Sequence, residues 1–146
     1  MQILFVCSGN TCRSPMAEYL FNQGAKAMGL GWRAASAGLL AGAGPMSGGA
    51  LRALQRRGVD GSPHRARQAT AAMVREADLV ICMSPAHRDG LWALCPGAAV
   101  SLLGGNGIRD PYGGPQSLYD SIMELIAQEV DGLLLQLQSL ERGREY

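Results

Sequence analysis

The chain opens with a short apolar run that leads directly into a cysteine and an arginine six positions apart. Residues 2–6 are mostly apolar and predict a buried strand. Pro15 lies where a helix over residues 16–20 would begin, at the first-turn position that proline favours. Between these two signals lie Cys7, Arg13 and five small or polar residues. The segment is therefore predicted to run from a strand through a tight loop into the N-terminus of a helix.

Such a loop is predicted to bind an anion. It points unpaired backbone N–H groups and the positive end of the helix dipole at one spot. The same field stabilises the thiolate form of Cys7, which makes this side chain a candidate nucleophile. Arg13 can hold two phosphate oxygens with its planar guanidinium. The residues expected to surround a bound phosphoryl group are Ser8, Gly9, Asn10, Thr11, Cys12 and Ser14.

The same spacing recurs from Cys82 to Arg88, but this second segment is not expected to bind an anion. It contains no glycine, and Pro85 lacks the backbone N–H that a phosphate-binding loop needs. We interpret it as the end of a strand followed by a turn, with Cys82 in the core.

Length and composition exclude several classes of protein. A chain of 146 residues predicts one domain over residues 1–146 with a single core. A net charge of +1 gives no general attraction to nucleic acid or to a membrane, so any preference for anions must be local. The sequence shows neither a secretory signal nor a membrane-spanning apolar run, which favours a cytoplasmic protein. The four cysteines fit no zinc spacing and are expected to be thiols.

Extended and helical patterns alternate along the rest of the chain. Three further strands are predicted over residues 32–37, 78–83 and 99–103. Helices are predicted over residues 16–28, 51–57, 70–74, 88–94 and 117–137. This alternation indicates an α/β fold, with a parallel sheet covered by helices on both faces. Loops at the carboxyl ends of the strands would then form the site.

Several polar residues receive no role in the site. His64 and His87 are expected to be surface or turn residues, because no partner for either can be identified. Arg52, Arg56 and Arg57 are expected to lie on the solvated face of their helix.

A cysteine that attacks phosphorus also needs a group that protonates the departing atom. Asp110 is the candidate, because it follows the last predicted strand and so lies at the same edge of the sheet as Cys7. Pro111 stiffens this loop, and the two glycines after Tyr112 let it bend over the site. Tyr112 is expected to form a wall of the pocket.

Four segments together resemble the low-molecular-weight protein tyrosine phosphatase family: residues 6–18, 36–38, 77–80 and 110–114. The resemblance covers nearly the whole chain, and its first motif is highly specific. It implies a four-stranded parallel sheet flanked by helices on both faces, a phosphate-binding loop after the first strand, no metal or other cofactor, and a phosphocysteine intermediate. It also implies residue roles: Cys7 as nucleophile, Arg13 as phosphate clamp, Ser14 and Asn10 as the groups that hold the loop and the thiolate, and Asp110 as general acid and then base.

Within that family, Thr11 bears most directly on the substrate. Tyrosine-directed members commonly carry isoleucine there, whereas Thr11 and the loop around Asp110 are similar to the bacterial protein-arginine phosphatases. Residues 46–50 offer no aromatic wall, which leaves Tyr112 alone to stack on a phosphotyrosine ring. Asp110 could accept N–H bonds from a phosphoarginine guanidinium, and Thr11 could add a polar contact. Proteins or peptides that carry phosphoarginine are the expected substrates.

Three alternatives stay open. A tyrosine phosphatase with the same machinery is the nearest. An arsenate reductase would need two further cysteines on a mobile segment, whereas Cys82 lies in a predicted strand and Cys95 lies 13 residues further on. A phosphate-binding module without activity would require a damaged triad, and Cys7, Arg13 and Asp110 are all present.

Cys12 has two interpretations. It is either a small buried loop residue, or it forms a reversible disulfide with Cys7 under oxidation and shields the nucleophile from sulfinic acid formation. The family resemblance favours the redox role.

Overall fold

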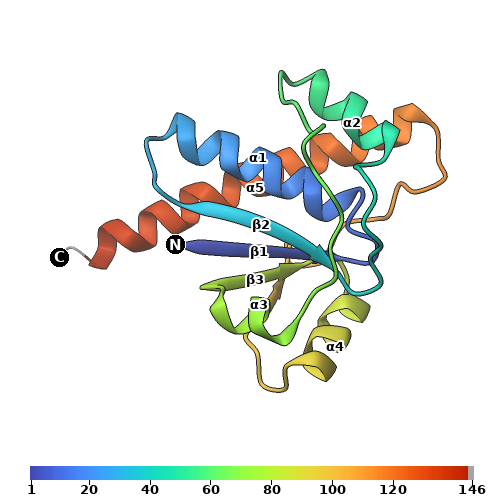
Figure 1. Ribbon diagram of the computed structural model, residues 1–146. Helices are drawn as coiled ribbons and strands as arrows, with labels where there is room; N and C mark the ends of the chain where they lie inside the picture. Colours follow the sequence, from blue (N-terminus) through green and yellow to red (C-terminus); the bar gives the residue numbers. More distant parts are fainter. Residues whose placement is uncertain (145–146) are drawn as a thin grey trace.

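A computed structural model describes residues 1–144 and shows a parallel sheet between two layers of helices (Figure 1). The strands are β1 (Gln2–Cys7), β2 (Arg33–Gly38), β3 (Leu79–Cys82) and β4 (Val100–Leu102). The helices are α1 (Arg13–Ala27), α2 (Gly48–Gln55), α3 (Ala71–Glu76), α4 (Pro85–Leu94) and α5 (Gln116–Arg144). The strands pair in the order β2-β1-β3-β4, all parallel. The predicted four-stranded α/β fold is confirmed.

The alternation of side chains along β1 divides the core between the two faces of the sheet. Ile3 and Phe5 point into the larger core, beneath α1, α2 and α5. Leu4 and Val6 point to the opposite face, where α3 and α4 pack. Successive residues of a strand face opposite sides, so a central strand covered on both faces has to be apolar throughout.

Helix α5 lies along the larger core and extends past the end of the sheet (Figure 1). Its apolar side packs into this core, with Ile126 and Val130 fully enclosed, whereas Leu125 is 38% exposed. Its polar side meets the C-terminal end of α2, because Arg56 and Arg57, which directly follow that helix, pair with Asp120 and Glu124 respectively. The arginines of α2 are exposed, as predicted, and exposed pairs of this kind typically contribute about 0–1 kcal/mol each.

Both proline-based boundaries differ from the prediction. Helix α1 begins at Arg13, so Pro15 is its third residue rather than its first. The turn predicted after Cys82 is wrong, since α4 begins at Pro85 and the Ser84 hydroxyl caps it by accepting from the backbone N–H of His87 at 3.2 Å. A proline in the first turn costs little, because the N–H it lacks would have no partner within the helix.

Other boundaries shift by a few residues. Helix α2 begins at Gly48, three residues before its predicted start, and β4 is shorter than predicted. Helix α5 continues to Arg144, well past the predicted end at Leu137.

The strand order places a ligand crevice at the end of β1. β2 lies on one side of β1 and β3 on the other, so the loops after these strands diverge at Cys7. Doubly wound sheets bind ligands at such a point. Gly38, opposite Cys7 in the β1–β2 register, allows the loops to meet, because a Cβ there would lie 2.3 Å from the Ser8 carbonyl oxygen. A larger residue at this position would displace the backbone of the loop.

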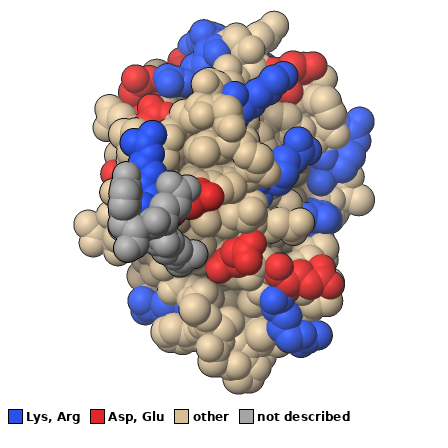
Figure 2. Space-filling view, turned by 90° about the vertical axis from the view of Figure 1, so that its left-hand side faces the viewer, with Lys and Arg blue, Asp and Glu red and all other residues tan. Residues whose placement is uncertain are grey.

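The strands begin at the opposite end of the molecule from the crevice. Figure 2 views this end and shows Lys and Arg side chains interspersed with Asp and Glu. No helix within residues 1–144 combines the length and apolar character that crossing a membrane requires.

Candidate active site

The loop between β1 and α1, residues 7–13, borders a cavity of about 440 Å³. We call it the phosphate-binding loop. Eight residues predicted for the site line the cavity: Cys7, Ser8, Gly9, Thr11, Cys12, Arg13, Asp110 and Tyr112. Leu40 and Gly42, from the loop after β2, also line it and were not predicted. The folded chain therefore brings together the nucleophile, the arginine and the carboxylate that the sequence singled out.

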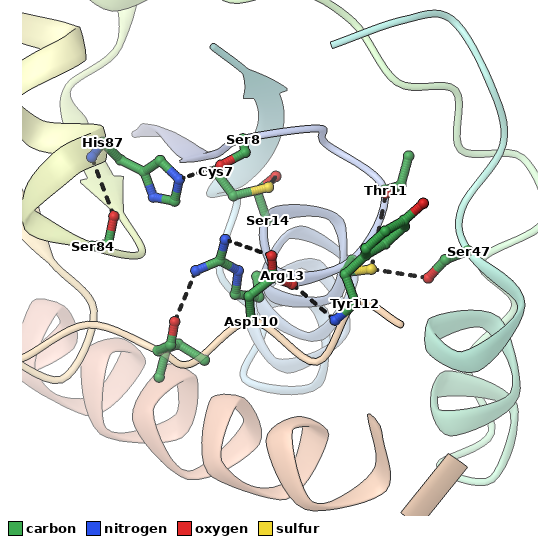
Figure 3. A network of polar contacts seen from close by, with 12 residues as sticks. Cys7, Ser8, Thr11, Arg13, Ser14, Ser47, Ser84, His87, Asp110 and Tyr112 are labelled. Atoms are coloured by element: carbon green, nitrogen blue, oxygen red, sulfur yellow. Dashed lines mark hydrogen bonds and ion pairs between the residues drawn. The ribbon is translucent and has the colours of Figure 1, made fainter. Parts of the chain in front are cut away.

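Arg13 connects the phosphate-binding loop to the loop that carries Asp110 (Figure 3). Its side chain is almost completely buried, and Nη1 donates to the Ile108 carbonyl oxygen at 2.9 Å. Its Nη2 lies 3.5 Å from Asp110 Oδ2. A guanidinium carries five N–H donors, so these contacts leave donors for an oxyanion in the cavity.

The sulfur of Cys7 shares a side-chain hydrogen bond with a residue of α1. Cys7 Sγ lies 2.9 Å from Ser14 Oγ, and Asn10 Nδ2 donates to the same oxygen at 2.8 Å. With Asn10 donating to its oxygen, the Ser14 hydroxyl can direct its own hydrogen at the sulfur, a geometry that suits a thiolate. Asn10 and Ser14 are both buried and do not line the cavity. The two side chains thus lie on the buried side of the loop rather than around a bound group.

Asn10 is the centre of the buried support. Its φ of 57° lies in the left-handed region, which asparagine tolerates better than most residues. His64 Nε2 donates to its carbonyl oxygen at 2.8 Å, and the Arg67 N–H donates to its Oδ1 at 3.0 Å. Of the two predicted alternatives, His64 closes a turn, with its backbone N–H donating to the Gly61 carbonyl oxygen at 3.1 Å, but at 6% exposure it is not a surface residue. Its side-chain partner lies 54 positions earlier, and no local sequence pattern signals that pairing.

A half-buried carboxylate extends this support to the surface of α1. Asn10 Nδ2 donates to Ser36 Oγ at 2.9 Å, and Ser36 Oγ donates to Glu18 Oε1 at 2.6 Å. Burial raises the pKa of Glu18, and the hydrogen bond from Ser36 opposes that rise. Ser36 and Glu18 lie within the segments that resemble the phosphatase family, but the sequence alone indicates no role for either.

Cys12 lies against α2 and α5 at the far side of the phosphate-binding loop. Its Sγ is 3.0 Å from Ser47 Oγ and 4.0 Å from the Tyr119 hydroxyl. Burial, together with the neighbouring thiol, raises the pKa of Tyr119, so its phenol is neutral at physiological pH. Cys12 is thus a buried thiol among neutral hydroxyl groups.

The loop over residues 103–115, called the Asp110 loop, is tied to the end of β3. The Ile108 N–H donates to the Met83 carbonyl oxygen at 2.8 Å. Gly107 allows this approach, because its φ is +87° and a Cβ would lie 2.4 Å from the same oxygen. Asp110 Oδ1 accepts from the Tyr112 N–H at 3.0 Å, and its side chain is half exposed. The carboxylate therefore faces the cavity from a loop whose base is fixed.

Two apolar side chains stand at the mouth of the cavity. Leu40 is 86% exposed and Tyr112 is 77% exposed, and both line the pocket. Tyr112 is thus located where a pocket wall was predicted. Leu40 lies in a glycine-rich loop without periodicity, so no sequence pattern singles it out.

His87 is the second histidine whose location differs from the prediction. It lies in α4 rather than in a turn, is 6% exposed, and its Nε2 is 2.7 Å from Ser8 Oγ. Figure 3 shows its ring directed at Ser8 beside Cys7. The sequence could not reveal this contact, because the two residues are 79 positions apart.

The remaining cysteines lie away from the cavity. Cys82 is fully buried in the core beneath α3 and α4, as predicted, and Cys95 caps the C-terminus of α4. Within residues 1–144, no group of three or more His, Cys, Asp or Glu side chains could hold a metal ion.

Comparison with known proteins agrees with this geometry. Residues 2–144 match the family model described as low molecular weight phosphotyrosine protein phosphatase. A probable low molecular weight protein-tyrosine-phosphatase, EpsP of Ralstonia nicotianae, is 34% identical over 94% of this chain and 97% of its own length. The protein-arginine-phosphatase of Bacillus subtilis is also 34% identical, over 88% of this chain and 93% of its own length.

A solved structure shows the same fold. The crystal structure of a low molecular weight protein tyrosine phosphatase from T. tengcongensis superposes with a TM-score of 0.89 at 39% identity, covering 93% of this chain and 99% of its own. Together with the family match, this similarity shows that the chain belongs to the low molecular weight phosphotyrosine protein phosphatase family.

Proposed function

We propose that this phosphatase removes phosphoryl groups from phosphoarginine in proteins, through a phosphocysteine intermediate. The observation that carries the choice of substrate is a pair of hydrogen-bond acceptors in the cavity lining, since Thr11 and the half-exposed carboxyl group of Asp110 both face the space next to Cys7. A guanidinium leaving group offers several N–H donors, and these two side chains can accept them.

In the first step, Cys7 Sγ attacks phosphorus and forms an S–P bond while the P–N bond to the arginine breaks. Asp110, in its protonated form, transfers a proton to the departing nitrogen. Backbone N–H groups of residues 8–13 and the Arg13 guanidinium stabilise the charge on the phosphoryl oxygens. The Ser14 hydroxyl, 2.9 Å from the sulfur, can donate to the attacking thiolate.

In the second step, a water molecule attacks the phosphocysteine. Asp110, now a carboxylate, accepts a proton from that water, the S–P bond breaks, and inorganic phosphate leaves with the Cys7 thiolate restored. No electrons are transferred, and Asp110 ends the cycle protonated as it began.

Phosphotyrosine is the second candidate substrate, and one observation favours it. Leu40 and Tyr112 give the mouth of the cavity two exposed apolar side chains that could flank an aromatic ring. Against this, residues 46–50 contribute no aromatic wall, since Met46 is buried in the core and Ser47 contacts Cys12.

Replacing Thr11 with isoleucine tests the choice between the two substrates. We expect the ratio of kcat/KM on a phosphoarginine peptide to that on a phosphotyrosine peptide to fall by about tenfold, as expected when one polar contact worth about 1–1.5 kcal/mol is lost. Thr70→Ile, which alters a threonine on the capping position of α3 away from the cavity, is the control. An unchanged ratio in Thr11→Ile would contradict the assignment of phosphoarginine.

An arsenate reductase would require cysteines that can relay electrons to the nucleophile. Cys82 is enclosed in the core on the α3 and α4 face, where its sulfur donates to the Ser84 carbonyl oxygen at 3.4 Å. Cys95 terminates α4, and neither residue lines the cavity. This arrangement supports hydrolysis over arsenate reduction.

Four free thiols also fit the reducing cytoplasm, where phosphorylated proteins or peptides would be the partners.

We also propose that Cys12 protects the nucleophile under oxidative conditions. Peroxide would convert the Cys7 thiolate to a sulfenic acid, and the Cys12 thiol would displace water from it to form a disulfide. Peroxide-treated wild type should therefore lose two thiols in mass spectrometry and recover most of its activity with a thiol reductant.

Cys12→Ser is the matched variant for this prediction, because serine preserves the size of the side chain near Ser47. Peroxide should inactivate it without recovery, as Cys7 proceeds to sulfinic acid. Irreversible inactivation of wild type would argue against a protective disulfide.

A further inference from the structure

His87 is a buried polar side chain for which the reaction described above has no use. It comes from α4, on the opposite face of the sheet from α1, and its Nε2 reaches Ser8 Oγ at 2.7 Å (Figure 3). Its backbone N–H donates to Ser84 Oγ, which fixes the start of the helix and the position of the ring. Ser8 immediately follows Cys7 and lines the cavity. Helix α4, which lies outside the phosphate-binding loop, thus contacts the Ser8 hydroxyl group within that loop.

The protonation of this ring follows from its surroundings. Burial lowers the pKa of His87 to about 4, and the charge of Arg13 acts in the same direction while Asp110 opposes it. The imidazole is therefore neutral at pH 7 and carries a single N–H.

The position of that hydrogen follows from the other ring nitrogen. Nδ1 of His87 is buried and has no hydrogen-bond partner among the described residues. A buried N–H without a partner is rarer in proteins than an unpaired acceptor, so the hydrogen belongs on Nε2. His87 then donates to Ser8 Oγ, and the hydroxyl hydrogen of Ser8 is left to point elsewhere.

We propose that His87 is a positioning residue that turns Ser8 into a hydrogen-bond donor toward the phosphoryl group. With its oxygen occupied by His87 Nε2, Ser8 presents its hydrogen to the cavity, where a phosphoryl oxygen next to Cys7 would accept it. With the opposite tautomer, Ser8 would donate to His87 and present lone pairs to an anion. Donors aimed at developing negative charge are among the largest contributions to catalysis.

This inference rests on the proposed phosphocysteine reaction but not on the choice between phosphoarginine and phosphotyrosine. The test therefore uses 4-nitrophenyl phosphate with Ser8→Ala, His87→Leu and the double variant. We expect each single variant to lose about five- to tenfold in kcat/KM, the effect of one hydrogen bond worth about 1–1.5 kcal/mol. The double variant should lose no more than Ser8→Ala alone, because His87 acts through Ser8. Multiplicative losses would overturn the proposal.

A conservative variant separates positioning from packing. The amide of His87→Gln can place an N–H close to Ser8 Oγ, so this variant should recover most of the activity that His87→Leu loses. If His87→Leu does not fold, vanadate inhibition of Ser8→Ala replaces it, with vanadate as the probe of the phosphoryl site. Ser8 is exposed and its substitution leaves the core intact. Vanadate binding as tight as in wild type would overturn the proposal.

Nitrogen-15 NMR of the imidazole provides a readout that needs no substrate. We expect the His87 signals of the neutral tautomer protonated on Nε2 at pH 7. Protonation on Nδ1 would overturn this inference while leaving the phosphatase reaction untouched. Conversely, turnover of 4-nitrophenyl phosphate that survives Cys7→Ser would refute the phosphocysteine reaction itself, whichever tautomer is found.

Discussion

Replacing Cys7 with serine is expected to lower the turnover of every phosphorylated substrate by about 10⁴-fold or more, as is typical when an enzyme nucleophile is removed. The structure supplies the physical reason. The Ser14 hydroxyl lies 2.9 Å from the sulfur and is itself held by Asn10, so a thiolate at this position has a hydrogen-bond donor within reach. A serine hydroxyl is far harder to ionise than a thiol, so the same field leaves it a poor nucleophile.

Steady-state assays on 4-nitrophenyl phosphate and on a phosphoarginine peptide would measure this loss. Cys95→Ser is the matched control, because Cys95 ends α4 and does not line the cavity. Iodoacetamide should label Cys7 selectively at neutral pH, and inorganic phosphate should protect it. Residual turnover within tenfold of wild type in Cys7→Ser would exclude a covalent intermediate on this residue.

Replacing Asp110 with asparagine is expected to slow turnover by about 10²–10⁴-fold when the leaving group is poor. Asparagine is nearly isosteric and retains an oxygen that can accept from the Tyr112 N–H, so the loop should keep its shape. What is lost is the proton for the departing atom and the ion pair with Arg13. The loss should be much smaller for 4-nitrophenyl phosphate, whose leaving group needs little protonation.

The dependence on leaving group is the decisive measurement for Asp110. Asp131→Asn, at an exposed position on α5, controls for the change in charge. Equal losses on good and poor leaving groups would show that the carboxylate acts on phosphate binding rather than as an acid. The inhibition constant of inorganic phosphate for Asp110→Asn would measure how much of the loss comes from a change in phosphate binding by Arg13.

Local patterns in the sequence were sufficient for the fold and for the residues on the rim of the cavity. The apolar run of β1 and the short loop before α1 determine where Cys7 and Arg13 lie, because both depend on neighbours in the chain. The amphipathic pattern of α5 likewise predicts its buried stripe. Asp110 was found because parallel strands bring their carboxyl ends to one edge.

The supporting residues could not be predicted in the same way. His64 and His87 contact the phosphate-binding loop across 54 and 79 positions, and their burial depends on tertiary packing alone. Leu40 reaches the mouth of the cavity from a loop without a regular pattern. The start of α4 at Pro85, by contrast, has a local signal in the sequence. Ser84 before it is a good helix cap, and proline is common at the first helical position.

The attachment of Arg13 to the Ile108 carbonyl oxygen has a consequence for the cost of binding. A long, flexible side chain ordinarily loses about 1.5–2 kcal/mol of conformational entropy when a ligand immobilises it. Here folding has already restricted those rotations, so an incoming oxyanion meets a receptor that is preorganised. Affinity for small anions should therefore owe more to this prior ordering than to the number of contacts.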